Sequence, residues 1–288
     1  MTREEFTQLA TSTVLLDGAT GSNLMKAGMP RGVCTEAWIL DHKDVIQKLQ
    51  RAYVEAGSRI LYAPTFGANR MALAQHGMED ELSRLNHILV SYCREAAGGR
   101  AYVAGDITTT GKMMPPAGDL TYEQALDTYQ EQMECLCDAG VDLFVAETMI
   151  QIDETLAALD AAASYDLPIL CTMTVESDGS IFSGGNIIEA AVMLEEAGAS
   201  AVGVNCSVGP DQLESVIRNI AKHVSVPVIA KPNAGMPFID DKGEAKYDMD
   251  ADSFAAHMIR LKDAGATLLG GCCGTDPQYI QALSRVLR

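Results

Sequence analysis

The sequence is short of positive charge. Its 288 residues hold 21 Lys and Arg against 39 Asp and Glu, which gives a net charge of −18. Nucleic-acid binding needs patches of Lys and Arg against the phosphate backbone, and anionic membrane surfaces attract the same residues. We therefore expect neither nucleic acid nor a membrane as a partner.

Long apolar runs are also missing. Although 48% of the residues are hydrophobic, no run approaches the ~18 residues of a membrane-spanning helix. The first ten residues, MTREEFTQLA, have neither the positive region nor the apolar segment of a secretory signal peptide. The sequence therefore predicts a cytoplasmic protein.

Cysteine, in contrast, is plentiful. The eight cysteines are Cys34, Cys93, Cys135, Cys137, Cys171, Cys206, Cys272 and Cys273. Disulfides are rare in cytosolic proteins, and a chain of this length can bury a sufficient core without them. We therefore expect buried thiols or metal ligands. The first five are expected to be small buried hydrophobic residues, because free cysteine is usually buried.

One pattern repeats along the whole chain: a short apolar run, a turn, and an amphipathic stretch. The runs are 13–19, 58–66, 101–107, 143–149, 168–175, 201–207, 226–233 and 267–274. They are continuous, as in strands buried on both faces. The clearest helices, 42–57, 121–140, 186–198 and 250–265, end at glycine, a usual C-terminal signal. Eight such units predict an α/β fold, a (β/α)₈ TIM barrel, as one domain over 1–288; a doubly wound open sheet is the alternative.

In such a barrel, the chemistry lies at the C-terminal ends of the strands and in the loops that follow. The polar residues at these ends are Asp17, Thr65, Asp106, Glu147, Thr174, Asn205, Cys206, Asn233, Cys272 and Cys273. The longest insertions, 20–41 and 108–120, both follow a strand. We therefore expect them on the active-site face.

Three of these strand-end residues, Cys206, Cys272 and Cys273, are thiols from strands six and eight. Three protein ligands with an open fourth position are typical of a catalytic zinc site. Adjacent residues of a strand point to opposite faces, so both thiols of the pair reach one ion only if the strand has ended. The glycines of GGCCG, residues 270–274, supply the backbone freedom for this. Alone, GGCCG would fit a redox pair equally well.

Six segments, in order along the chain, carry a family resemblance. They are LLDGATGSNL (15–24), PTFGANR (64–70), AETM (146–149), GVNCSVGP (203–210), KPNAG (231–235) and GGCCGT (270–275). Together they resemble the homocysteine S-methyltransferase family, most specifically through NC combined with GGCCG. The family is a zinc-containing (β/α)₈ barrel whose members transfer a methyl group to the thiol of homocysteine and form methionine.

The resemblance implies a role for individual residues. The three zinc ligands of the family correspond to Cys206, Cys272 and Cys273. The two acids that bind the ammonium of homocysteine correspond to Asp17 and Glu147. The turn whose amides receive the substrate carboxylate corresponds to Gly18, Ala19 and Thr20, and Asn205 corresponds to a polar neighbour that we assign to substrate binding.

The chain also departs from the family pattern. Ala19 and Thr20 replace the second Gly and the Met of the common Asp-Gly-Gly-Met-Gly turn. Tyr62 and Pro64 stand where the family commonly has Glu and Asn. Betaine-dependent members carry Tyr after the second acid, where this chain has Thr148, so betaine is disfavoured as the donor.

The resemblance favours a methylated corrinoid, free or protein-bound, as the donor. Because the chain ends at SRVLR shortly after the last predicted helix, we expect a separate corrinoid protein to carry it. S-methylmethionine or S-adenosylmethionine is the alternative donor. Two further alternatives remain: a zinc-thiolate binding protein without methyltransferase activity, and an aldolase-type barrel with Lys231 as its Schiff-base lysine. Lys231 and Asp106 could also simply pair inside the rim.

Overall fold

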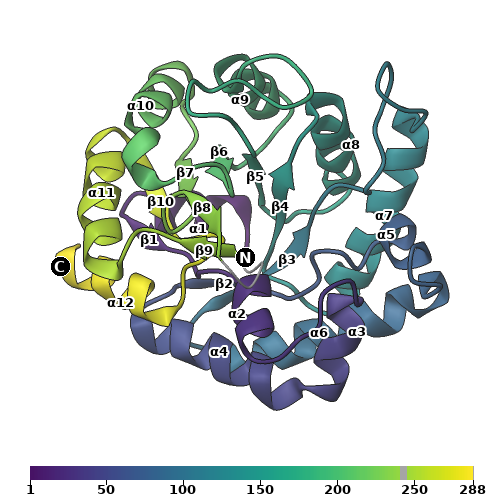
Figure 1. Cartoon of the computed structure of the whole chain (residues 1–288). Coiled ribbons are helices and arrows are strands. Elements are labelled where there is room, and N and C mark those ends of the chain that lie inside the picture. Colours follow the sequence, from purple (N-terminus) through teal and green to yellow (C-terminus); the bar gives the residue numbers. More distant parts are fainter. Residues whose placement is uncertain (241–244, 288) are drawn as a thin grey trace.

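The computed structural model describes residues 1–240 and 245–287. Within these ranges, eight parallel strands form one sheet in the order β1-β10-β7-β6-β5-β4-β3-β2, and helices surround it (Figure 1). The strands are β1 Val14–Leu15, β2 Ile60–Tyr62, β3 Tyr102–Ile107, β4 Leu143–Met149, β5 Ile169–Met173, β6 Ala201–Asn205, β7 Val228–Lys231 and β10 Ala266–Leu269. The predicted (β/α)₈ TIM barrel is confirmed; that 1–288 forms a single domain stays a prediction.

The barrel closes between β1 and β2 without a regular ladder. Arg59 N donates to Leu15 O at 2.7 Å, and the hydroxyl of Ser58 donates to Leu16 O at 3.0 Å. Towards the C-terminal ends of these two strands, Tyr62 N donates to Oδ2 of Asp17 at 2.8 Å. The carboxylate of Asp17 thus takes the place of a backbone acceptor at this seam, which fixes its position at the mouth of the barrel.

One helix of the outer ring follows each barrel strand. These helices are α4 Lys43–Ala56, α6 Leu82–Ala97, α7 Tyr122–Asp138, α8 Ile152–Ala162, α9 Ile187–Glu196, α10 Glu214–His223, α11 Ala251–Asp263 and α12 Pro277–Val286. The glycines after α4 and α11, Gly57 and Gly265, have φ of 117° and 120°. Because this left-handed region favours glycine, the predicted stop signals are confirmed there.

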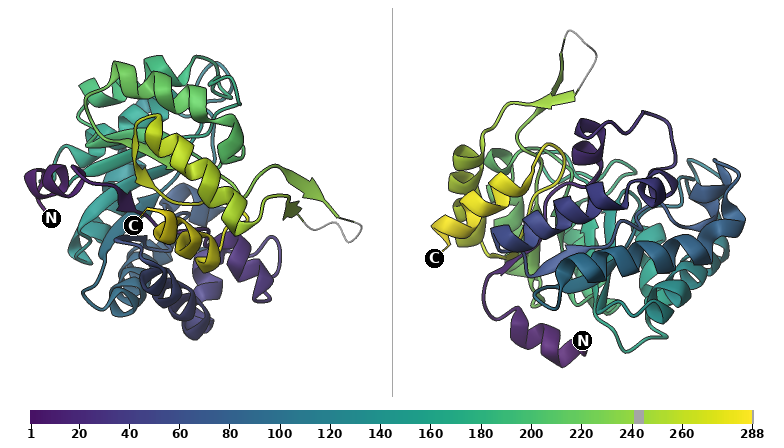
Figure 2. Two further views of the ribbon diagram at one scale, coloured as in Figure 1. Left: turned by 90° about the vertical axis from the view of Figure 1, so that its left-hand side faces the viewer. Right: turned by 90° about the horizontal axis from the view of Figure 1, so that it is seen from below.

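Shorter elements decorate the loops. They are α1 Arg3–Leu9, α2 Gly21–Lys26, α3 Thr35–Asp41, α5 Arg70–Ala74, the 3₁₀ turns η1 Glu79–Glu81 and η2 Pro210–Gln212, and the antiparallel strands β8 Pro237–Ile239 and β9 Ala245–Tyr247. Figure 2 shows α1 and the β8–β9 pair at opposite ends of the barrel. Phe6 and Ala10 pack with Val14, Leu16 and Ile60 at the α1 end, so that end is filled by apolar side chains.

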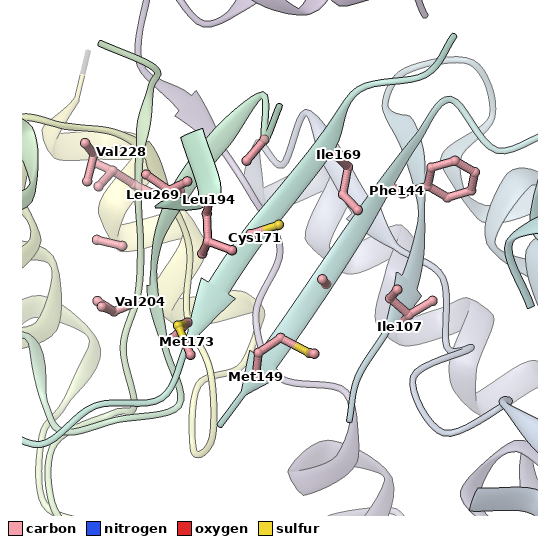
Figure 3. Packing of buried hydrophobic residues seen from close by; sticks show 14 of the residues in the cluster. Ile107, Phe144, Met149, Ile169, Cys171, Met173, Leu194, Val204, Val228 and Leu269 are labelled. Atoms are coloured by element: carbon pink, nitrogen blue, oxygen red, sulfur yellow. The ribbon is translucent and has the colours of Figure 1, made fainter. Parts of the chain in front are cut away.

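Apolar residues also fill the space around the strands (Figure 3). Phe144, Ile169 and Met173 belong to one buried cluster there. Cys93 and Cys171 lie in the same cluster and Cys34 in another, all three buried. The prediction of buried hydrophobic cysteines is confirmed for these three, while Cys135 and Cys137 are half-buried. In the described part of the chain, no helix has the length and apolar character needed to cross a bilayer.

Candidate functional site

A cavity of about 390 Å³ lies at the C-terminal ends of the barrel strands. Its lining residues are Asp17, Gly18, Ala19, Thr20, Gly21, Ser22, Thr35, Glu36, Tyr62, Pro64, Phe66, Asp106, Glu147, Thr148, Cys206, Lys231, Cys272 and Cys273. The insertion 20–41 therefore reaches the cavity, as predicted. Among the described residues, none of 108–120 lines it; Met114 of that insertion is buried instead.

The three predicted metal ligands lie together. The sulfur atoms of Cys206, Cys272 and Cys273 are all within 4.8 Å of one another, and the Cys206 and Cys273 sulfurs are 3.4 Å apart. Zn–S distances of ~2.3 Å in a tetrahedral site place the sulfurs about 3.8 Å from one another. The spacing and the soft sulfur donors therefore fit a zinc ion.

The pair Cys272 and Cys273 reaches this position because β10 has already ended at Leu269. Backbone bonds hold the segment beside the end of β7: Cys272 N donates to Pro232 O at 2.7 Å, and Ala234 N donates to Cys273 O at 2.9 Å. The strand end required by the sequence argument is confirmed. Hydrogen bonds to the segment after β7 therefore fix the backbone of Cys272 and Cys273.

The glycines around the pair act differently from the prediction. Only Gly274 has a left-handed φ, of 85°. A Cβ on Gly270 would come within 2.7 Å of Asp17 O, and one on Gly271 within 2.5 Å of the Thr275 hydroxyl. Close packing, not conformational freedom, therefore requires the first two glycines.

Two non-glycine residues of the cavity wall have left-handed backbone, Cys206 with φ of 48° and Thr148 with φ of 59°. Such residues cost roughly 1–3 kcal/mol each and persist when their surroundings enforce them. The side chain of Asn205 does so for Thr148: its Oδ1 accepts from Thr148 N and its Nδ2 donates to Thr148 Oγ1, both at 2.8 Å. Nδ2 is also 3.7 Å from the sulfur of Cys272. Asn205 itself is fully buried, so it supports the wall from behind; contact with a substrate stays a prediction.

The three thiols change one another's acidity through their hydrogen bonds. Hydrogen bonds from Cys206 and then Cys272 lower the pKa of Cys273, while hydrogen bonds with Cys272 and Cys273 raise the pKa of Cys206. Burial, followed by the charge and hydrogen bond of Cys273, raises the pKa of Tyr247. Tyr247 lies on β9, and the sequence offers no signal for it, because a strand of three residues is too short to show a period.

The two predicted acids also meet, but a lysine lies between them. Nζ of Lys231 is 3.0 Å from Oε1 of Glu147 and 3.2 Å from Oδ1 of Asp17. It also lies 4.2 Å from the centre of the Tyr62 ring. The side chains of Lys231 and Asp17 are 3% and 2% exposed, so this charge cluster is buried. The sequence left open a pairing of Lys231 with Asp106. In the structure, Lys231 forms its ion pairs with Asp17 and Glu147 instead.

Burial dominates the acidity of the cluster. Burial raises the pKa of Asp17 to about 6, and Lys231 offsets part of this effect. Burial also raises the pKa of Glu147. For Lys231, burial alone would lower the pKa, but Glu147 and Asp17 outweigh it and raise the value well above the ordinary one. A Schiff-base lysine must lose its proton to attack a carbonyl, so this cluster argues against the aldolase alternative.

The turn after β1 lies at the cavity as predicted, but one of its amides is already used. Ala19 N donates to the hydroxyl of Thr275 at 3.1 Å, while Gly18 and Thr20 line the cavity beside it. A Cβ on Gly18 would come within 2.7 Å of the Tyr53 hydroxyl. The neighbouring amides, rather than that of Ala19, are therefore the candidates for binding a carboxylate.

Comparison with known proteins agrees with the sequence resemblance. Methionine synthase of Mycobacterium leprae (strain TN) is 30% identical over 295 aligned positions, which cover 96% of this chain and 24% of that protein. Methionine synthase of Mycobacterium tuberculosis (strain ATCC 25618 / H37Rv) is 29% identical over 287 positions, covering 93% and 24%. This chain thus spans about a quarter of the length of these curated relatives.

Solved structures agree on the fold. The metallated form of the homocysteine methyltransferase MmuM from Escherichia coli superposes with a TM-score of 0.80 at 21% identity, covering 96% of both chains. Its oxidised form gives 0.79 at 20% identity, covering 95% of this chain and 96% of that one. The model of the family described as homocysteine S-methyltransferase matches residues 14–287. The chain therefore belongs to the homocysteine S-methyltransferase family.

Proposed function

We propose that this protein transfers a methyl group to the thiol of homocysteine and forms methionine, with zinc held by Cys206, Cys272 and Cys273. The observation that carries the proposal is one cavity with three converging thiols and the buried acids Asp17 and Glu147. Membership of the family supports homocysteine as the acceptor. The spacing of the thiols supports zinc as the metal.

A thiol with a reference pKa of ~8.5 is mostly protonated at neutral pH, and a zinc ion at these cysteines would deprotonate it. Asp17 and Glu147 orient the acceptor through its ammonium group, and positioning of this kind contributes several kcal/mol to many reactions. The new S–CH₃ bond forms as the bond between the methyl group and its donor breaks, with the electron pair staying on the donor. Among the described residues, no histidine lines the cavity, in agreement with a transfer that needs no general base.

The donor that we propose is a methylated corrinoid, free or carried by a separate corrinoid protein. The segments GVNCSVGP (203–210) and PNAGMP (232–237) resemble the methionine synthase barrel and support this choice. S-methylmethionine or S-adenosylmethionine remains the alternative donor. A zinc-thiolate protein without methyltransferase activity is the alternative of a different class, because three thiols alone account for zinc but not for methyl transfer.

The test supplies the zinc-loaded protein with homocysteine and one donor in each reaction: methylcobalamin, a methylated corrinoid protein, S-methylmethionine, S-adenosylmethionine or betaine. We expect methionine with a corrinoid donor and none with betaine. The Cys272→Ala variant is the matched negative control. Zinc at one ion per chain without methionine from any donor would reject the proposal and favour the zinc-thiolate alternative.

A further inference from the structure

The two acids assigned to the ammonium group of homocysteine already hold an ammonium group, that of Lys231. We propose that Lys231 determines acceptor specificity by competing with the amino group of the acceptor for Asp17 and Glu147. This inference rests on the proposed function, because it concerns the same acceptor site. Its consequence is that the amino group contributes less to acceptor binding than two free carboxylates would provide.

The position of Lys231 is built into the barrel. Its backbone is in register with Asn205 of β6, and its carbonyl accepts from Cys206 N at 3.3 Å. A Cβ on Gly270 would come within 3.0 Å of Cγ of Lys231, so the absence of a side chain there makes room for the lysine stem. The Tyr62 ring lies 4.2 Å from Nζ. The backbone, the aliphatic stem and the ammonium group of Lys231 are therefore each held by a separate contact.

The charges of the cluster explain why a competitor is present. Two buried carboxylates without a cation are costly, and Lys231 offsets that cost before any acceptor binds. An acceptor remains available beside the lysine: Oδ1 of Asp106 has no hydrogen-bond partner among the described residues, whereas Oδ1 of Asp17 is already 3.2 Å from Nζ of Lys231. An arriving ammonium group can therefore bind beside the lysine or in its place. Beside the lysine, the arriving ammonium group is repelled by the like charge of Nζ. In the place of the lysine, it must break the ion pairs of Nζ. Either cost offsets part of its attraction to the acids.

Two acceptors separate this effect from all other contacts. L-homocysteine and 4-mercaptobutanoate share the thiol and the carboxylate, and only the former has the amino group. The dissociation constants of both are measured by calorimetry on the zinc-loaded wild type and on Lys231→Met, which keeps the length of the side chain without its charge. We expect the preference for L-homocysteine to rise at least tenfold in the variant. An unchanged or reduced preference would overturn the proposal.

A second pair of variants keeps the test decisive if Lys231→Met does not fold. Asp17→Asn retains an acceptor for Tyr62 N, and the double variant Asp17→Asn/Lys231→Met has the same net charge in the cluster as the wild type. The preference should again rise at least tenfold from the single to the double variant; equal preferences would reject the competition. Methionine formation by the wild type tests the proposed function separately, because it can succeed whether or not the preference changes.

Discussion

The two halves of the cavity differ in how their buried acidic groups are balanced. The ends of β1, β4 and β7 bring two acids together with a lysine that neutralises part of their charge. The ends of β6 and β10 bring three thiols together, and these hydrogen-bond to one another. The carboxylate half therefore contains its own cation, whereas the thiol half would need a cation from outside to hold three thiolates. This difference supports the proposal that the metal binds in the thiol half and the charged end of the acceptor in the carboxylate half.

The largest effect is expected in the thiol half. Cys206→Ala should lose about one zinc per chain, because two thiolates hold the ion far more weakly than three, and methionine formation should fall to background. Metal analysis of the purified protein measures the first effect. Cys137→Ala, which removes a half-buried thiol from α7, is the matched control and should keep its zinc. Retained zinc in Cys206→Ala would reject the ligand assignment.

In the carboxylate half, Glu147→Gln should weaken binding of L-homocysteine by about 10- to 100-fold, since hydrogen bonds to charged groups contribute roughly 1.5–3 kcal/mol. Zinc content should not change. Glu154→Gln is the matched control: Glu154 is a fully buried acid that bonds to Thr110 and Tyr129 outside the cavity. The Glu154→Gln variant should have a lower melting temperature but an unchanged dissociation constant for L-homocysteine. Equal effects of both variants on binding would contradict a specific contact with Glu147.

The pH dependence of acceptor binding should report the ionisation of Asp17. Because its pKa is raised to about 6, the free protein loses this negative charge as the pH falls through 6, and binding of the acceptor's ammonium should weaken over the same range. Asp17→Asn should lack this component, while the proton on the acceptor thiol affects both proteins alike. Calorimetry between pH 5 and 8 measures the ratio of the two dissociation constants, and a ratio that does not change with pH would contradict the charge assignment. Folding shows the opposite sign: the raised pKa of Asp17 favours the folded state below the ordinary value of 3.8, and this contribution is lost as the pH rises through 6.

A smaller effect is expected where the two halves meet. Asn205→Ala should weaken zinc binding by about 10- to 100-fold, as for other side chains that support metal ligands, because it frees Thr148 and removes the contact to Cys272. It should also destabilise the fold by roughly 1–3 kcal/mol through its lost buried hydrogen bonds. Chelator competition and denaturant unfolding measure the two effects. Asn219→Ala, an exposed position on α10, is the control, and similar zinc affinities in both variants would refute a supporting role.

The sequence could predict much of this site because it depends on strand ends. Continuous apolar runs locate the ends of the strands, and the order of strands in a barrel brings Cys206 close to the pair 272–273. The same reasoning places Asp17 and Glu147 on one face. The sequence also contains a signal for α1, because Thr2 and Glu5 form a capping box, a recognisable start of a helix.

Long side chains and irregular backbone could not be predicted in this way. The sequence shows that Lys231 ends a strand, but not that its stem crosses the barrel mouth to both acids. The left-handed φ of Thr148 and Cys206 has no signature in residue type, because glycine is the usual residue there. The strands β8 and β9 have three residues each, too few for a period to be read.

The most direct test replaces zinc by Co²⁺, whose absorption reports the number of bound thiolates. The cobalt protein is titrated with L-homocysteine and, as a control, with L-homoserine, which has a hydroxyl in place of the thiol. We predict that the thiolate-to-metal absorption increases and saturates at one homocysteine per metal, and that homoserine leaves it unchanged. A protein that binds cobalt through its cysteines but shows no change with homocysteine would contradict the assignment of this cavity to activation of the acceptor thiol.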